Sequence, residues 1–204
     1  MNPRKRKFWS WTKNEDTGQR ELWLEGVIAE DSWWGDEITP AIFKEELHAG
    51  NGPILLHICS PGGDCIAASQ IYTMLMDYPA DVIVQIDGVA ASAASVVAMA
   101  GTTVRMSPTA LMMVHNPWTT AMGDVSDMQK AINLLDEVKE SIINAYQIKT
   151  GLGRTKLSNI MDAETWLNAH KAKELGFCDE VLYEDMENET DIKEIRRIST
   201  ASEL

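Results

Sequence analysis

The stretch Asp87-Gly-Val-Ala-Ala-Ser-Ala-Ala-Ser95 joins a predicted strand to a predicted helix and indicates the fold class of the chain. The run before it, 82–86 (VIVQI), is rich in β-branched residues, as is typical of a buried strand. We expect this strand to break at Gly88 and a short helix to begin near Ser95. Small residues at such a turn leave room for a substrate backbone, and the N–H groups after a serine there can face an oxyanion. A serine that only caps the helix is the competing interpretation.

Strands and helices alternate on both sides of this turn, which predicts an α/β fold with a largely parallel sheet. We expect strands at 22–29, 53–59, 82–86, 102–106, 111–114 and 177–182. We expect helices at about 40–49, 64–77, 95–100, 126–149, 155–161 and 169–175. The 204 residues therefore predict one domain over 21–183, with a polar tail over 1–20 and an acidic tail over 184–204.

The predicted helix over 126–149 is long and amphipathic. Ser126 and Gln129 have the spacing of a capping box at its start, and Gly151 is expected to end it. Apolar residues recur along it at steps of three and four. Such a stripe packs either within the chain or against another subunit.

The composition narrows the class of protein. A net charge of −13 argues against a nucleic-acid partner. The three cysteines, Cys59, Cys65 and Cys178, have no metal-ligand spacing and suggest no disulfide framework, which favours a reducing intracellular compartment. We find neither an apolar run of about 20 residues nor a secretory signal, so we expect no membrane partner.

A nucleophilic serine at the 87–95 turn needs a base and an orienting acid. His115 ends a predicted strand, as Ser92 and Gly63 follow others, and functional groups gather at the carboxyl ends of parallel strands. Of the other histidines, the one at 57 is expected in the core and those at 48 and 170 at the surface. Asp162 and Glu164 lie in a predicted loop from which a carboxylate can reach a histidine.

Four motifs resemble the proteolytic subunit of the Clp protease (ClpP), over roughly residues 22–183. They are Ser60-Pro-Gly-Gly63, Gly88-Val-Ala-Ala-Ser92, Met113-Val-His-Asn-Pro117 and the segment from Trp166 to Asp179. The resemblance implies a ClpP/crotonase-like fold: stacked β-α-β units with a projecting handle helix, here the helix over 126–149. It also implies homo-oligomeric rings that act on protein or peptide substrates.

The same resemblance assigns the site. Ser92 is the implied nucleophile, His115 the general base, and the N–H groups of Gly63 and Ala93 the oxyanion hole. Counting along the motif places the third member at Glu164, with Asp162 as the alternative. The chemistry needs no metal, nucleotide or organic cofactor.

Two differences from the housekeeping members of the ClpP family suggest that the chain resembles another branch of that family. Ala93-Ala94 stands where housekeeping members have Met-Gly, and residues 1–20 lack their apolar loop for an ATPase ring. The chain is in this respect similar to phage-encoded head maturation proteases, which process scaffold and capsid proteins without ATP. That implies the host cytoplasm or the procapsid interior.

Three alternatives stay open at this point. A crotonase-like enzyme would act on acyl-coenzyme A thioesters, although that chemistry does not require a serine–histidine pair. A degradative ClpP-type subunit would work with an unfoldase. A catalytically decayed ClpP-like protein would serve assembly alone.

Overall fold

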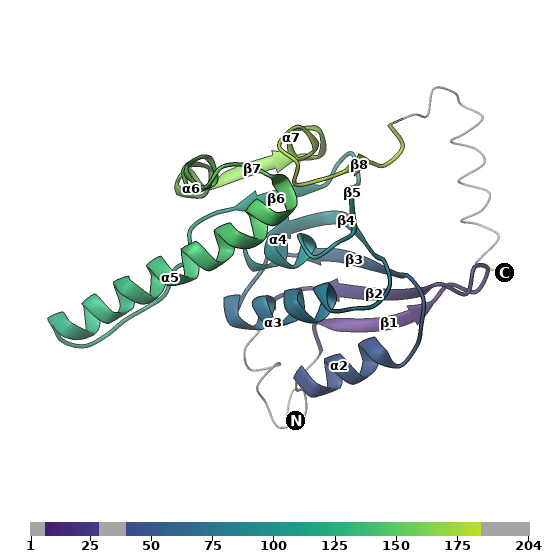
Figure 1. The fold of residues 1–204 in the computed structure, drawn as a ribbon, viewed down its shortest axis with the longest axis horizontal. Helices are drawn as coiled ribbons and strands as arrows, with labels where there is room; N and C mark the ends of the chain where they lie inside the picture. The colour runs from purple at the N-terminus through teal and green to yellow at the C-terminus, as the bar shows by residue number, and fades with distance from the viewer. Residues whose placement is uncertain (1–6, 29–39, 185–204) are drawn as a thin grey trace, which may run out of the picture.

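The computed structural model describes residues 7–28 and 40–184 of the chain (Figure 1). The predicted cap at Thr39 and the acidic tail beyond Glu184 lie outside these residues. The elements in chain order are β1 (Trp9–Lys13), β2 (Arg20–Glu25), α2 (Pro40–His48), β3 (Ile54–Ser60), α3 (Cys65–Met76), β4 (Val82–Ala91), α4 (Ala93–Ala98), β5 (Thr103–Met106), β6 (Leu111–Val114), α5 (Val125–Thr150), α6 (Arg154–Asp162), β7 (Thr165–Asn168), α7 (Ala169–Glu174) and β8 (Glu180–Val181).

One eight-stranded sheet organises the molecule, in the order β1-β2-β3-β4-β5-β8, with β6 joined to both β4 and β7. The pairs that involve β1 or β7 are antiparallel, and the others are parallel. The strands of β-α-β units therefore end at a common edge, as the alternation predicts. The α/β class is confirmed.

Among the described residues, the apolar core packs on one face of β3. Alternate residues of β3, from Ile54 to Ser60, are fully buried beneath α2, α3 and α4, whose apolar side chains belong to the same core. The opposite face of β3 and β4 carries His57, Gln85 and Asp87. A strand that is apolar on one face and polar on the other is typical of a sheet with one open face.

Three local predictions require correction. Residues 9–13 were expected within a polar tail, but they form the edge strand β1, whose backbone pairs with β2. Because side chains of a strand point alternately to its two faces, Trp9 is buried there against Phe43. Strand β4 does not break at Gly88: it continues to Ala91, and its pairing changes from β5, with which it pairs as far as Ile86, to β6, with which it pairs from Val89 onward. The capping box of α5 is made by Asp124 and Asp127 rather than by Ser126 and Gln129.

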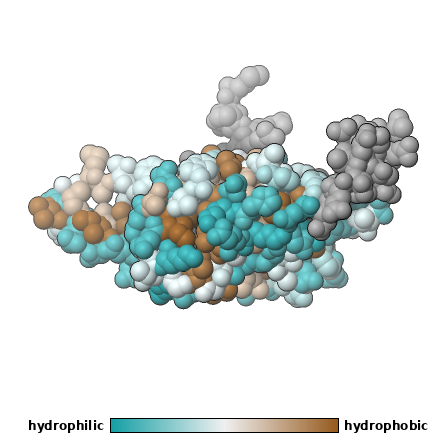
Figure 2. All heavy atoms as spheres, turned by 90° about the horizontal axis from the view of Figure 1, so that it is seen from above, coloured by the Kyte–Doolittle hydropathy of each residue, from teal (hydrophilic) through white to brown (hydrophobic). Residues whose placement is uncertain are grey.

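Helix α5 projects from the domain, as the resemblance implies (Figure 1). Its buried residues all lie in its second half, between Ile142 and Tyr146. The space-filling view in Figure 2 shows apolar side chains at the projecting end. Met122 and Val125, at the start of the helix, are 92% and 87% exposed. This end of the helix has no cover from the described part of the chain.

Candidate active site

Ser92 lies between the end of β4 and the start of α4 in a strained backbone conformation. Its φ of 55° and ψ of −126° are rare for a residue with a side chain. Such a conformation costs about 1–3 kcal/mol and persists where the surroundings fix it, often at functional sites. The Ser92 side chain makes no helix-capping hydrogen bond. Ser92 thus occupies the N-cap position of α4, but its side chain is not used for capping.

The pairing of β6 with β4 brings His115 to Ser92. Val89–Ala91 of β4 run parallel to Leu111–Met113 of β6, so the two strands end together. The Ser92 N–H donates to the Met113 carbonyl at 2.9 Å. Ser92 Oγ lies 2.7 Å from His115 Nε2, within hydrogen-bond distance. This geometry is the one that a nucleophile and its general base require.

The turn after β3 packs directly on Ser92 and needs its glycines. A Cβ at Gly62 would lie 2.6 Å from the Ala91 oxygen and 2.9 Å from the Ala93 nitrogen. A Cβ at Gly63 would lie 1.8 Å from the Ile28 oxygen. Both residues also have φ in the positive region, at 94° and 148°. Only glycine permits this approach of the backbone.

Two backbone N–H groups near Ser92, those of Gly63 and Ala93, are available to a ligand. The Gly62 carbonyl and the Asp64 N–H both bond to Ile28, so the N–H of Gly63 points away from Ile28. Ala93 is the first residue of α4. Its N–H has no acceptor within the helix, because the N–H groups of the first helical turn have none. The predicted oxyanion donors therefore flank Ser92 on two segments.

The structure places the two candidate carboxylates differently. In the antiparallel β6–β7 pair Val114 lies opposite Thr165, so continuing the register puts Glu164 opposite His115. Glu164 is exposed, has a φ of 46°, and its carboxylate makes no hydrogen bond within the described residues. No carboxylate in residues 7–28 and 40–184 is hydrogen-bonded to His115. The sequence did not predict β7, whose four residues have no clear periodicity.

Asp162 is engaged elsewhere. Its carboxylate accepts hydrogen bonds from Lys139 Nζ at 2.6 Å and from Asn116 Nδ2 at 2.9 Å. These partners hold the pKa of Asp162 below its ordinary value. Asp162 therefore contacts the neighbour of His115 rather than His115 itself. Asn116 was not predicted as a site residue, although it adjoins His115 in the motif.

The remaining histidines lie apart from Ser92. His57 is 8% exposed, as predicted, and its Nδ1 lies 2.7 Å from Asp87 Oδ2 on the open face of the sheet. His48 ends α2, and His170 is exposed on α7. None of them hydrogen-bonds to Ser92 in the described chain.

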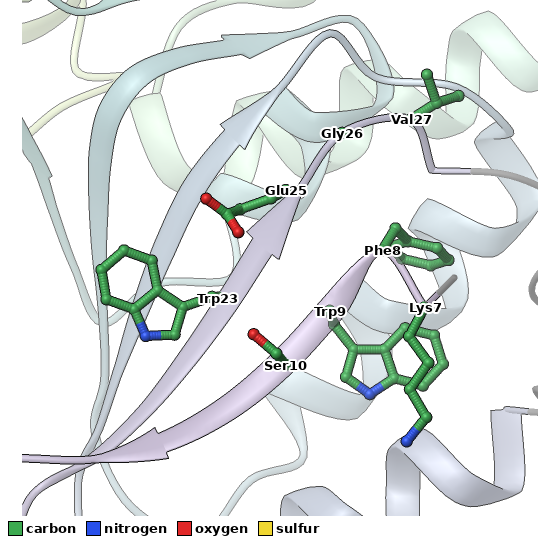
Figure 3. A pocket seen from close by; sticks show the side chains of 8 residues that line it. All are labelled: Lys7, Phe8, Trp9, Ser10, Trp23, Glu25, Gly26 and Val27. Carbon is green, nitrogen blue, oxygen red and sulfur yellow. The ribbon is translucent and has the colours of Figure 1, made fainter. Parts of the chain in front are cut away.

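Within residues 7–28 and 40–184, no three His, Cys, Asp or Glu side chains are grouped to hold a metal ion. No helix of this part of the chain is both long and apolar enough to span a bilayer. A shallow pocket lies between β1 and the end of β2, lined by residues from Lys7 to Ser10 and by Trp23, Glu25, Gly26 and Val27 (Figure 3). Its lining contains none of the predicted site residues.

Comparison with known proteins gives concordant matches. The family model of Clp protease matches residues 18–185. The ATP-dependent Clp protease proteolytic subunit of Bacteroides fragilis (strain ATCC 25285) is 33% identical over 131 residues, 63% of this chain and 63% of that protein. The subunit of the same name from Bdellovibrio bacteriovorus is 31% identical over 156 residues, 72% of this chain and 74% of that protein. The chain spans less than two thirds of the length of the Bacteroides relatives, at 63% and 60%.

A solved structure agrees in fold. A ClpP1 mutant from Listeria monocytogenes superposes with a TM-score of 0.68 at 21% identity, over 79% of this chain and 90% of that chain. This likeness confirms the predicted ClpP-like α/β fold. With the family model matching 168 of 204 residues (18 to 185), the chain belongs to the Clp protease family.

Proposed function

We propose that this chain is a serine endopeptidase that hydrolyses peptide bonds through an acyl-enzyme. The observation that carries the proposal is the 2.7 Å contact between Ser92 Oγ and His115 Nε2 at a strained residue. The glycine turn adds an N–H donor beside it. Family membership supports the same reaction, since the curated relatives are named as proteolytic subunits.

The reaction follows from these positions. Ser92 Oγ attacks the peptide carbonyl while His115 Nε2 takes its proton, and the C–O bond forms as the carbonyl oxygen becomes an oxyanion. The N–H groups of Gly63 and Ala93 stabilise that charge; losing one such donor costs about 100- to 1000-fold in rate. The C–N bond then breaks as His115 returns the proton to the leaving amine. Water repeats the steps and releases Ser92.

We assign the orienting carboxylate to Glu164. Two observations support this assignment: Glu164 comes one residue before the Val114–Thr165 pair of β6 and β7, as His115 comes one residue after it, and Asp162 is held by Lys139 and Asn116. A glutamate can stabilise the imidazolium as an aspartate does, because the charge is the same and the reach is longer.

We further propose that the enzyme works without ATP and processes scaffold and capsid proteins during phage head maturation, in the host cytoplasm or procapsid. Ala93-Ala94 after the nucleophile supports this branch, as does β1, which holds residues 9–13 in the sheet with Trp9 buried. The alternative is a degradative subunit that needs an unfoldase, and the ATP-dependent relatives favour it. Both the maturation protease and the degradative subunit would assemble as homo-oligomers through the exposed end of α5.

The test is covalent labelling of the full chain by a fluorophosphonate probe, followed by digestion of casein and of a phage scaffold protein. We expect labelling at Ser92, none in Ser92→Ala, and cleavage of both proteins without nucleotide. Cleavage only when ATP and a Clp unfoldase are added would favour the degradative alternative. An assembled wild-type chain that neither labels nor cleaves would reject the enzyme and leave an assembly protein.

A further inference from the structure

Two buried hydroxyl groups lie directly behind Ser92. Ser95, in the first turn of α4, is fully buried, and Tyr146 of α5 is 1% exposed. Ser95 Oγ donates to the Ser92 carbonyl oxygen at 2.5 Å, and the Tyr146 hydroxyl lies 2.7 Å from Ser95 Oγ. Burying hydroxyls is costly unless they are hydrogen-bonded. Here each hydroxyl is hydrogen-bonded to the other, and Ser95 is also bonded to the backbone carbonyl of Ser92.

The direction of the hydrogen bonds can be assigned. A hydroxyl carries one hydrogen, and that of Ser95 is donated to the Ser92 carbonyl. Tyr146 must therefore donate to Ser95. Burial raises the pKa of Tyr146, so its hydroxyl stays protonated and remains a donor. The bonds run in one direction, from Tyr146 to Ser95 to Ser92, and bonds in such a chain polarise one another.

The Ser92 carbonyl belongs to the same peptide group as the Ala93 N–H. Because a trans peptide is planar, its C=O and N–H point in opposite directions, and fixing one fixes the other. The Ser92 carbonyl also accepts from the Ser95 N–H at 3.0 Å, and the Ser92 N–H is held by Met113. The peptide groups on both sides of Ser92 are thus anchored. The hydroxyl pair anchors the group that carries the proposed oxyanion donor.

We propose that Ser95 and Tyr146 are positioning residues that aim the Ala93 N–H at the oxyanion and keep Ser92 in its strained conformation. This inference rests on the proposed function, since it assumes that Ser92 is the nucleophile. It connects α5, the projecting helix, to the reacting centre through two side chains. A purely structural role for the pair would affect stability alone.

The experiment separates reactivity from stability with four variants of the full chain. Ser95→Ala removes the donor and leaves the Tyr146 hydroxyl buried without a partner. The double variant Ser95→Ala/Tyr146→Phe removes the donor and the orphaned hydroxyl together. Tyr146→Phe alone leaves the Ser95 donor without its orienting partner. Tyr78→Phe is the matched control, because Tyr78 donates to the Gly52 carbonyl at 2.9 Å, and neither residue touches the Ser92 turn.

The readouts are the fluorophosphonate labelling rate at Ser92, kcat and KM on a peptide, and urea unfolding. We expect labelling and kcat to fall about tenfold in both Ser95→Ala and the double variant, below the cost of losing an oxyanion donor outright. We expect KM and the pH profile of kcat to stay as in wild type. Tyr146→Phe should lose less, and Tyr78→Phe nothing. The order of the variants in free energy of unfolding should differ from their order in labelling rate, since the double variant regains stability that Ser95→Ala loses.

Two results would overturn the inference, and they differ from failure of the proposed function. Labelling at the wild-type rate in Ser95→Ala and the double variant would leave the pair a structural role only. Reactivity that recovers in parallel with stability in the double variant would do the same. If Ser95→Ala does not fold, the double variant and Tyr146→Phe decide between these outcomes. A wild-type chain that is not labelled at all would reject the proposed nucleophile, and the positioning role with it.

Discussion

Two histidines of this chain make side-chain contacts of equal length, and only one of them lies at a reactive turn. His115 Nε2 is 2.7 Å from Ser92 Oγ, and His57 Nδ1 is 2.7 Å from Asp87 Oδ2. The first pair has a nucleophile without a bound carboxylate. The second has a carboxylate without a nucleophile. A histidine in a short polar contact is therefore no sign of a site by itself.

The backbone around each pair makes the difference. Around His115 a strand ends, a residue adopts positive φ, and N–H groups are left for a ligand. Around His57 the strands continue side by side, with Trp23 stacked on the ring at 3.8 Å and Gln85 donating to Asp87. Each member of that pair is held by the other or by a neighbour on the same strands, and no serine, strand end or strained residue lies in this contact. The proposed catalytic role of His115 therefore rests on its place at a strand end rather than on its residue type.

The largest expected effect comes from the same substitution in both pairs. His115→Gln should lower kcat/KM for a peptide by up to about a millionfold, because no base then takes the Ser92 proton. His57→Gln should leave the rate close to that of wild type. A peptidase assay of both variants, with circular dichroism to check folding, makes the comparison. Comparable losses in two folded variants would show that the open face takes part in catalysis.

The second-largest effect is expected at the carboxylate proposed to orient His115. Glu164→Gln should lower kcat by about 10,000-fold, the typical cost of neutralising an orienting carboxylate. Asp162→Asn should cost much less, since Asp162 acts on Asn116 and not on His115. Single-turnover cleavage at neutral pH measures both. The opposite ranking would assign the role to Asp162, and two unaffected variants would mean that His115 works without an acid.

The sequence predicts the Ser92 end of the sheet better than the rest. Residues 82–101 carry local signals, a β-branched run followed by small residues, so a strand followed by a helix is predictable, although the continuation of the strand past Gly88 is not. Strand β7 is not, because its four residues form a strand only through pairing with β6. The Glu164–His115 register depends on that pairing. The Ser95–Tyr146 contact joins residues 51 positions apart, and no local pattern indicates it. Alternation of Trp9 and Trp11 did signal β1, but polar neighbours obscured it.

The third effect tests the close approach at the reactive turn with two glycines of similar φ. Gly62 and Gly52 have φ of 94° and 88°, so alanine strains both, by about 1–2 kcal/mol. Only at Gly62 would the new Cβ meet backbone atoms, whereas Gly52 faces open space. Gly62→Ala should therefore slow Ser92 labelling about 100-fold, the typical cost of a displacement of about 1 Å at a site. Gly52→Ala should lose only stability. Equal labelling rates in the two variants would contradict the proposed role of the turn.

The smallest effect concerns the unreactive pair and its dependence on pH. Partial burial opposes ionisation of Asp87, but hydrogen bonds from His57 and Gln85 outweigh it and lower the pKa of Asp87 below its ordinary 3.8. A carboxyl with a lowered folded pKa stabilises the protein above the unfolded value and loses that contribution as pH falls through the folded value. Asp87→Ala should thus reduce the free energy of unfolding by about 1 kcal/mol at neutral pH, a figure discounted for partial exposure.

Urea unfolding of wild type and Asp87→Ala across the acid range measures this contribution. The gap between the two proteins should hold above about pH 4 and narrow below it. Glu180→Ala is the control, because Glu180 pairs with Arg105 on the same face but is more exposed, so its loss should be smaller. A gap that persists unchanged in acid would trace the loss to packing instead of charge. Ser92 labelling should be the same in all three proteins, because the His57–Asp87 pair stabilises the sheet and takes no part in the reaction.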